Sequence, residues 1–245
     1  MSNNRVVWLT PEDPPQVFPP VDNALREPDG LLAAGGDLSP ERLLAAYRRG
    51  IFPWYDDGQP LLWWSPDPRC VFLQGDLHIS RRLRRELRRS TAEVRFNTAF
   101  AEVIRRCAGP RRHEQGTWIT NDMIDAYERL HEAGWAHSIE VWQDDTLIGG
   151  LYGLIIGRAV FGESMFSLRS NASKIALLVL DRMLENGTFG LVDCQVQSHH
   201  LANMGASNLP RRQFVELLND LCEPDDAFES WPENPVFASE LLRNP

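Results

Sequence analysis

Residues 146–197 constrain the fold of this chain more than any other stretch. They open with the longest apolar run in the sequence, residues 147–156, which is too apolar for a strand at the surface. A Gly-Arg turn signal follows, and residues 159–166 are typical of the returning strand. The next apolar residues fall at helical spacing and stop at Gly187, before a last strand over residues 191–196. The stretch therefore predicts two strands joined by a turn, then a helix and a further strand.

The last of these strands carries polar residues that a buried strand rarely has. Side chains alternate between the two faces of a strand, so we expect Asp193, Gln195 and Gln197 on one face and Cys194 on the other. An unpaired polar group inside a protein costs about 1–3 kcal/mol, so these residues need partners or a function. We interpret Asp193 and Gln195 as candidate catalytic residues; the alternative is a hydrogen-bonded polar pair in the core.

Length and composition indicate an ordinary soluble protein. A chain of 245 residues, 43% hydrophobic and 24% charged, can bury a large core. We expect a small N-terminal α+β domain over residues 1–67 and a larger domain over residues 68–245. No segment reaches the roughly 18 uninterrupted apolar residues of a membrane span, and we expect no signal peptide. Four scattered cysteines without a C-x-x-C pair are typical of a reduced, cytoplasmic protein.

Positive charge is concentrated in one segment of a chain whose net charge is −9. Residues 69–112 hold twelve Arg against four acidic residues, and six of these Arg lie within residues 80–89. On a helix these six cover an arc of about 160°, with Leu83 and Leu87 on the opposite side. A solvated helix usually mixes charge signs, and the apolar stripe is too narrow for membrane insertion. The pattern therefore favours a polyanion, bound through its phosphates.

Aromatic residues gather in two proline-broken segments, at residues 51–55 and 61–68. One interpretation is core packing, because large aromatic side chains dominate protein cores. The other is a platform for a flat ligand such as a nucleobase, where stacking is worth about 1–3 kcal/mol per base.

Several familiar chemistries lack their motifs. Ser164 has no second glycine after it and no strand-to-helix context, so a serine hydrolase is not indicated. Cys194, His199 and His200 lack the spacing of metal ligands, and we expect no metal. Cys194 is also a poor candidate nucleophile, because it should point away from Asp193 and Gln195.

The predicted order of elements resembles the Gcn5-related N-acetyltransferase fold, an acyl-CoA N-acyltransferase type of domain. An enzyme of that fold that uses acetyl-CoA needs a glycine-containing pyrophosphate loop before its central helix. Residues 167–172 occupy this place and contain no glycine. We therefore expect an α+β chain with an acetyltransferase-like larger domain, but no CoA and no other cofactor.

Nine sequence stretches together resemble one enzyme family, the leucyl/phenylalanyl-tRNA–protein transferases. The resemblance covers nearly the whole chain and is far more specific than any single motif. The matching stretches are ALREPDGLL (24–32), GGDLS (35–39), RGIFPW (49–54), LWWSPDPR (62–69), GTWIT (116–120), HSIEVW (137–142), GESMFS (162–167), NASK (171–174) and DCQ (193–195). This resemblance implies transfer of Leu or Phe, and also Met, from aminoacyl-tRNA to proteins that begin with Arg or Lys. It further implies a cytoplasmic monomer that marks its acceptors for N-degron degradation.

The resemblance also implies roles for individual residues. Trp54 and Trp118 stand where tryptophans hold the terminal adenosine of the donor. Asp193 and Gln195 stand at the catalytic positions, and Glu163 stands at the aminoacyl pocket.

Further residues are implied in the donor pocket and in the tRNA contact. Leu151, Val160 and Leu180 stand where we expect Met, Phe and Phe in the better-known members, which leaves the size of the pocket and its donor preference open. The tRNA would meet the basic helix at Arg81, Arg84, Arg85 and Arg88.

The chemistry such a transfer needs is modest, because forming an amide from an ester is downhill. A free α-amino group has a pKa of about 8, so a useful fraction is neutral near pH 7, and the enzyme mainly has to position two substrates. We hypothesise that Gln195 accepts a hydrogen bond from the attacking amine, while Asp193 orients Gln195 and balances the developing positive charge. Two alternatives stay open here: a CoA-dependent N-acetyltransferase and a non-catalytic tRNA-binding module.

Overall fold

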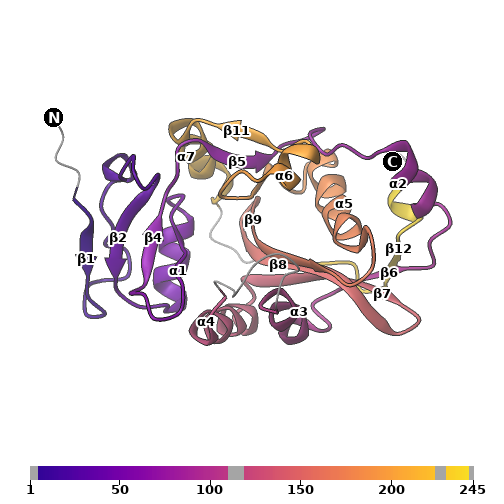
Figure 1. The fold of residues 1–245 in the computed structure, drawn as a ribbon, viewed down its shortest axis with the longest axis horizontal. Coiled ribbons are helices and arrows are strands. Elements are labelled where there is room, and N and C mark those ends of the chain that lie inside the picture. The colour runs from indigo at the N-terminus through magenta and orange to yellow at the C-terminus, as the bar shows by residue number, and fades with distance from the viewer. Residues whose placement is uncertain (1–4, 110–118, 224–229, 243–245) are drawn as a thin grey trace.

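A computed structural model describes residues 5–109, 119–223 and 230–242 of the chain. It confirms a mixed α and β architecture built on two sheets, with the N-terminal sheet at one end of the molecule (Figure 1). Among the described residues, no helix combines the length and the apolarity needed to cross a membrane.

The first sheet has four strands in the order β1-β2-β4-β3. Strands β1 and β2 are parallel and the other pairs are antiparallel. Helix α1 follows β2, and its N-terminus is capped by Ser39, whose side chain accepts a hydrogen bond from the Arg42 N–H. The elements are β1 (Val7–Leu9), the 3-10 helix η1 (Val21–Asn23), β2 (Leu31–Gly35), α1 (Pro40–Tyr47), β3 (Phe52–Pro53) and β4 (Leu62–Trp64).

The second sheet has eight strands in the order β11-β5-β10-β9-β8-β7-β6-β12. Strands β7, β8 and β9 form an antiparallel meander, and β10 returns parallel to β9. The strands are β5 (Arg69–Phe72), β6 (Glu93–Phe96), β7 (Ala136–Gln143), β8 (Thr146–Ile156), β9 (Ala159–Ser167), β10 (Leu191–Asp193), β11 (Ser207–Leu209) and β12 (Val236–Phe237). The predicted strand pair at the centre of the chain is thus confirmed.

Helices cover both faces of this sheet, α3 and α4 on one side and α5 on the other (Figure 1). Strand β8 is therefore apolar on both faces: Tyr152 packs with the first group of helices and Leu151 with α5. The helices are α2 (Arg81–Leu87), α3 (Phe100–Cys107), α4 (Asn121–Glu132), α5 (Ala172–Glu185), α6 (His199–Asn203), α7 (Arg211–Leu221) and the 3-10 helix η2 (Glu240–Leu242).

The two sheets share a hydrophobic core. Tyr47 and Trp63 of the N-terminal part belong to the same buried cluster as Tyr127 and Phe161 of the larger part. The expected boundary at residue 67 falls between the last strand of the first sheet and the first strand of the second, and it stays a prediction.

One prediction about residues 191–196 is wrong, and the start of α5 has a contact that the sequence does not indicate. Strand β10 ends at Asp193, and Gln195 has a left-handed backbone with φ of 57°, so the alternating pattern predicted over residues 191–196 is wrong beyond Asp193. Asn171 precedes α5 but its side chain does not cap the helix; the amide donates instead to Glu86 Oε2 of α2, at 2.8 Å.

Candidate active site

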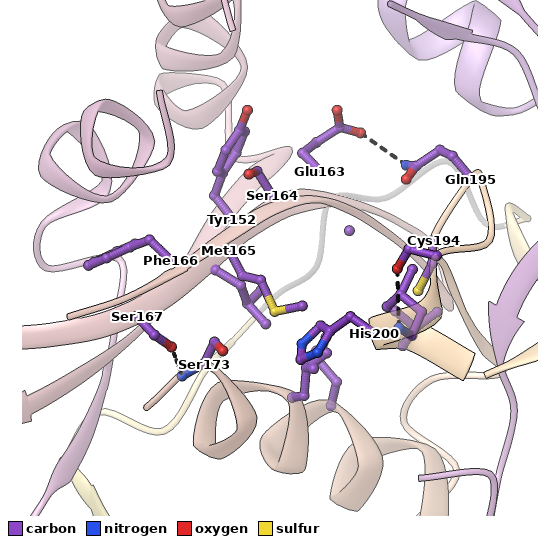
Figure 2. A pocket seen from close by; sticks show the side chains of 17 residues that line it. Tyr152, Glu163, Ser164, Met165, Phe166, Ser167, Ser173, Cys194, Gln195 and His200 are labelled. Carbon is purple, nitrogen blue, oxygen red and sulfur yellow. Dashed lines mark hydrogen bonds between the residues drawn. The ribbon is translucent and has the colours of Figure 1, made fainter. Parts of the chain in front are cut away.

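The larger of two neighbouring cavities has a volume of about 620 Å³ and lies between β9, α5 and the segment that follows β10. Glu163 and Gln195 lie at one end, with Ser167 and Ser173 at the other (Figure 2). Most of its wall is apolar, formed by Leu151, Met165, Phe166, Leu177, Leu180, Val192 and Leu201. An apolar wall with a few polar groups at one end is the usual build of a small-molecule site.

The smaller cavity, of about 140 Å³, brings the N-terminal part of the chain to the same place. Phe52, Pro53 and Trp54 line it from one side. The Trp54 ring lies 5.7 Å from that of Trp64 and remains 41% exposed, so it presents an aromatic surface to a ligand. The residues that line both cavities are Glu163, Cys194 and Gln195.

Glu163 reaches this junction because strand β9 carries a β-bulge. Tyr152 and Gly153 of β8 pair with Ser164 and Gly162, so Glu163 is the extra residue between them. Gly153 allows this close approach, because a Cβ on it would lie 2.2 Å from the Phe161 carbonyl oxygen.

Two buried phenols hold the Glu163 carboxyl. Tyr47 of α1 donates to Oε1 at 2.6 Å, and Tyr127 of α4 donates to Oε2 at 2.9 Å. Burial raises the pKa of Glu163 to about 7, although both phenol hydrogen bonds oppose this shift. Burial and the neighbouring Glu163 charge also hold the pKa of each tyrosine well above its usual value, so both phenols remain donors.

The Glu163 carboxyl and the two tyrosine hydroxyls form a closed triad of oxygen atoms. The Tyr47 and Tyr127 hydroxyls also contact one another, so three short oxygen contacts close a triangle. Two phenols supply two protons, and the third contact becomes a hydrogen bond only when Glu163 is protonated. The two bonds that the phenols donate favour the ionised form of Glu163.

Gln195 is oriented by Glu163. Its Nε2 donates to Glu163 Oε1 at 3.4 Å, a long hydrogen bond that Figure 2 shows across the end of the cavity. A carboxylate only accepts hydrogen bonds, so the amide must turn its NH₂ toward Glu163 and its carbonyl oxygen elsewhere. That oxygen has no hydrogen-bond partner among the described residues, so it can accept a hydrogen bond from a bound substrate.

Asp193 lies behind the cavities rather than in them. Arg69 Nε donates to its Oδ1 at 2.8 Å and Nη2 to its Oδ2 at 2.7 Å, and both side chains are fully buried. Asp193 Oδ1 also accepts the backbone N–H of Gln195 at 2.9 Å. Asp193 therefore fixes the backbone of Gln195 and its charge is compensated by Arg69, which differs from the shared strand face that we expected.

Arg69 joins several parts of the fold. It donates to the Gly50 carbonyl at 3.0 Å and lies between the rings of Phe52 and Phe214, at 4.7 and 4.6 Å. In the sequence, Arg69 stands out only as the first arginine of the basic segment, residues 69–112. A buried aspartate needs a cationic partner, so Asp193 in a buried strand indicates that such a partner exists. The sequence does not indicate that the partner is Arg69.

The remaining expected residues have different placements. Leu151 and Leu180 line the larger cavity, whereas Val160 is buried in the adjoining core and lines neither cavity. Trp118 lies outside the described residues. Tyr47 and Tyr127 were not predicted, because in the sequence they are indistinguishable from core residues of their helices.

Cys194 differs from its expected orientation, because the strand ends before it and its side chain lines both cavities. A hydrogen bond with Cys70 and burial raise the pKa of Cys194 well above its usual value, so the thiol stays protonated and is a poor nucleophile. Within the described part of the chain, no group of three or more His, Cys, Asp or Glu is placed to hold a metal ion.

The basic helix α2 is docked as predicted, with Leu83 and Leu87 buried. Among the described residues, one arginine of this helix is paired: Arg82 forms a salt bridge with Glu86 at 2.8 Å. Four further arginines, the expected tRNA contacts, are exposed on or directly after the helix: Arg81, Arg84, Arg85 and Arg88.

Comparison with known proteins gives consistent matches along the chain. Residues 71–219 match the family model described as leucyl/phenylalanyl-tRNA protein transferase, and residues 36–67 match the model of the N-terminal domain of that family. The chain is 57% identical over 213 residues to the leucyl/phenylalanyl-tRNA–protein transferase of Stutzerimonas stutzeri, covering 87% of this chain and 93% of that protein. It is 60% identical over 197 residues to that of Aromatoleum aromaticum, covering 80% and 83%.

Among solved structures, a GCN5-related N-acetyltransferase from Kribbella flavida is 10% identical and superposes with a TM-score of 0.36, covering 70% of this chain and 61% of that one. So loose a superposition carries no argument about the site.

Proposed function

This chain belongs to the leucyl/phenylalanyl-tRNA–protein transferase family, whose members are aminoacyltransferases, and on that premise we propose how its site works. The donor is aminoacyl-tRNA carrying Leu, Phe or Met, and the acceptor is a protein with N-terminal Arg or Lys. The reaction takes place in the cytoplasm and marks the acceptor for N-degron degradation. The observation that carries this proposal is the meeting of two cavities at Glu163 and Gln195.

The two cavities suit the two halves of the donor's end. The larger one, of about 620 Å³, is apolar and would take the amino-acid side chain against Leu151 and Leu180. The smaller one would take the terminal adenosine, with its base on the exposed face of Trp54. The ester that joins the halves would then lie at the junction, beside Gln195.

The acceptor amine would attack the ester at this junction. Its neutral nitrogen donates a hydrogen bond to the free carbonyl oxygen of Gln195, which points its lone pair toward the ester carbon. As the C–N bond forms, the nitrogen gains positive charge, and the C–O bond to the 3′-oxygen of the ribose breaks. The proton passes from nitrogen to this leaving oxygen, with the neighbouring 2′-hydroxyl as relay.

The carboxylate that balances the developing charge is Glu163, which revises the role we first gave to Asp193. Arg69 already compensates the Asp193 charge through two hydrogen bonds. Glu163 faces both cavities and has no cationic hydrogen-bond partner among the described residues, only two phenols and the Gln195 amide. The same carboxylate is a suitable partner for the cationic end of an acceptor's first residue.

The tRNA body would meet α2. Replacing Arg84 and Arg88 with Gln should lower the slope of log Kd against log salt by roughly 1–2, since each phosphate contact contributes about 0.7–0.9. Filter binding of deacylated tRNA between low and moderate salt measures this slope. An unchanged slope would remove α2 from the tRNA interface.

Transfer of labelled Leu from Leu-tRNA to a short peptide that begins with Arg tests the proposal. A peptide that begins with Ala is the control for acceptor recognition. Glu163→Gln should lose most of the activity, whereas Glu132→Gln, an exposed site at the end of α4, should keep it. Equal transfer to both peptides, or full activity of Glu163→Gln, would contradict the acceptor role given to Glu163.

A further inference from the structure

Lys174 is the only lysine of the chain and it stands in the first turn of α5, a helix that lines the larger cavity. Its neighbour Ser173 lines this cavity. The Lys174 ammonium forms no salt bridge with any described residue, although the side chain is half-buried. A lone ammonium beside the donor cavity has no role in the chemistry derived above.

His200 of α6 also lies at this cavity. Its ring lines the larger cavity and faces α5 (Figure 2). The side chain is exposed and close enough to Lys174 for the two charges to interact: burial and the Lys174 charge both lower the pKa of His200. Lys174 and His200 thus place two nitrogen donors on elements that both line the larger cavity, beside the positive end of a 14-residue helix.

This place is on the route from the cavity to the basic helix. Asn171, three residues before Lys174, donates to Glu86 of α2 at 2.8 Å. Three helical residues span about 4.5 Å along the axis, so Lys174 lies within about one turn of the contact with α2. Helix α5 stands between α6, which carries His200, and the basic helix α2 (Figure 1).

The aminoacyl-tRNA donor that the proposed function requires carries phosphates that match these two nitrogen donors. Its amino acid is esterified to the end of a single strand, and each preceding nucleotide adds a phosphate. A strand that leaves the junction and continues to α2 has to cross the surface between them. We propose that Lys174, together with His200, binds a backbone phosphate in the single-stranded 3′ end of the donor tRNA. This inference rests on the function proposed above.

A series of three phenylalanyl donors tests the site: Phe-tRNA, the trinucleotide CCA carrying Phe, and adenosine carrying Phe without any phosphate. Lys174→Gln should raise KM for Phe-tRNA and for the trinucleotide on the order of 5- to 10-fold, with kcat little changed. This is the loss expected for one charged hydrogen bond whose strength is reduced by solvent screening. The KM for phenylalanyl adenosine should stay the same. Lys174→Arg should restore most of the affinity, and His200→Gln should reproduce the pattern more weakly.

The double change of Arg84 and Arg88 to Gln provides the contrast, because it should raise KM for Phe-tRNA alone. A Lys174→Gln effect of equal size on all three donors would show a distorted cavity and overturn the inference, as would an unchanged KM for the trinucleotide. Failure of the unmodified enzyme to use any of the three donors would refute the proposed function itself.

Discussion

The hydroxyl of Tyr127 tunes the acidity of Glu163, and its removal should move the pH dependence of transfer. Tyr127→Phe keeps the packed ring but deletes the 2.9 Å hydrogen bond to Glu163 Oε2. A hydrogen bond to a charged group is worth about 1.5–3 kcal/mol, and 1.36 kcal/mol corresponds to one pH unit. Since the lost bond favoured the carboxylate, the pKa of Glu163 should rise from about 7 by roughly one to two.

The consequence at neutral pH is a loss of ionised enzyme. With a pKa of about 7, half of the Glu163 carboxyls carry charge at pH 7. In the variant this share falls below roughly a tenth, so kcat/KM should drop about 5-fold or more at pH 7 and recover as pH rises. The drop is attributable to ionisation only if it is recovered in this way.

The assay is kcat/KM for a peptide that begins with Arg, measured from pH 6 to 9 with the ester donor checked for hydrolysis at each pH. The amine of the peptide titrates identically with both enzymes, so the difference between the profiles reports an enzyme group. Tyr55→Phe is the matched control, because that hydroxyl contacts Thr120 and not Glu163. Superimposable profiles for Tyr127→Phe and the unmodified enzyme would refute the reasoning.

Three further expectations follow from the same geometry. Asp193→Asn leaves the buried Arg69 uncompensated and should lower the free energy of unfolding by about 3–5 kcal/mol in a denaturant titration; unchanged stability would contradict a buried ion pair. Leu180→Phe fills part of the larger cavity and should raise the kcat/KM ratio of Leu-tRNA over Phe-tRNA by about 10-fold, whereas a constant ratio would place the donor side chain elsewhere. The folded state binds the Glu163 proton more tightly than the unfolded state, so the free energy of unfolding should fall as pH rises from 4.5 to about 7. Glu163→Gln should lack this part of the pH dependence. The same pH dependence in the variant and the unmodified protein would argue against the raised pKa of Glu163.

The elements around the site could be predicted where their pattern is local. The meander of β8 and β9 and the helix α5 follow from apolar runs, one turn signal and helical spacing. The exposed arginines of α2 follow from a helical wheel, because Leu83 and Leu87 fix which side is buried. Each of these depends on residues less than about 15 positions apart.

The site itself depends on contacts between distant residues. Glu163 meets a phenol 116 positions away in Tyr47 and another 36 positions away in Tyr127, and neither has a local signal. Asp193 finds Arg69 at a separation of 124 residues. The alternation rule fails after Asp193 because the backbone turns left-handed at Gln195, whose N–H is taken by the Asp193 carboxylate rather than by a neighbouring strand. No sequence pattern along residues 191–196 predicts this turn.

The most direct test of the central claim is a crystal structure with adenosine that carries phenylalanine through a stable 3′-amide in place of the ester. We predict the adenine on Trp54 in the smaller cavity, the phenyl ring between Leu151 and Leu180 in the larger one, and the amide carbonyl next to Gln195 and Glu163. A base in the larger cavity, or a carbonyl remote from Gln195 and Glu163, would contradict it.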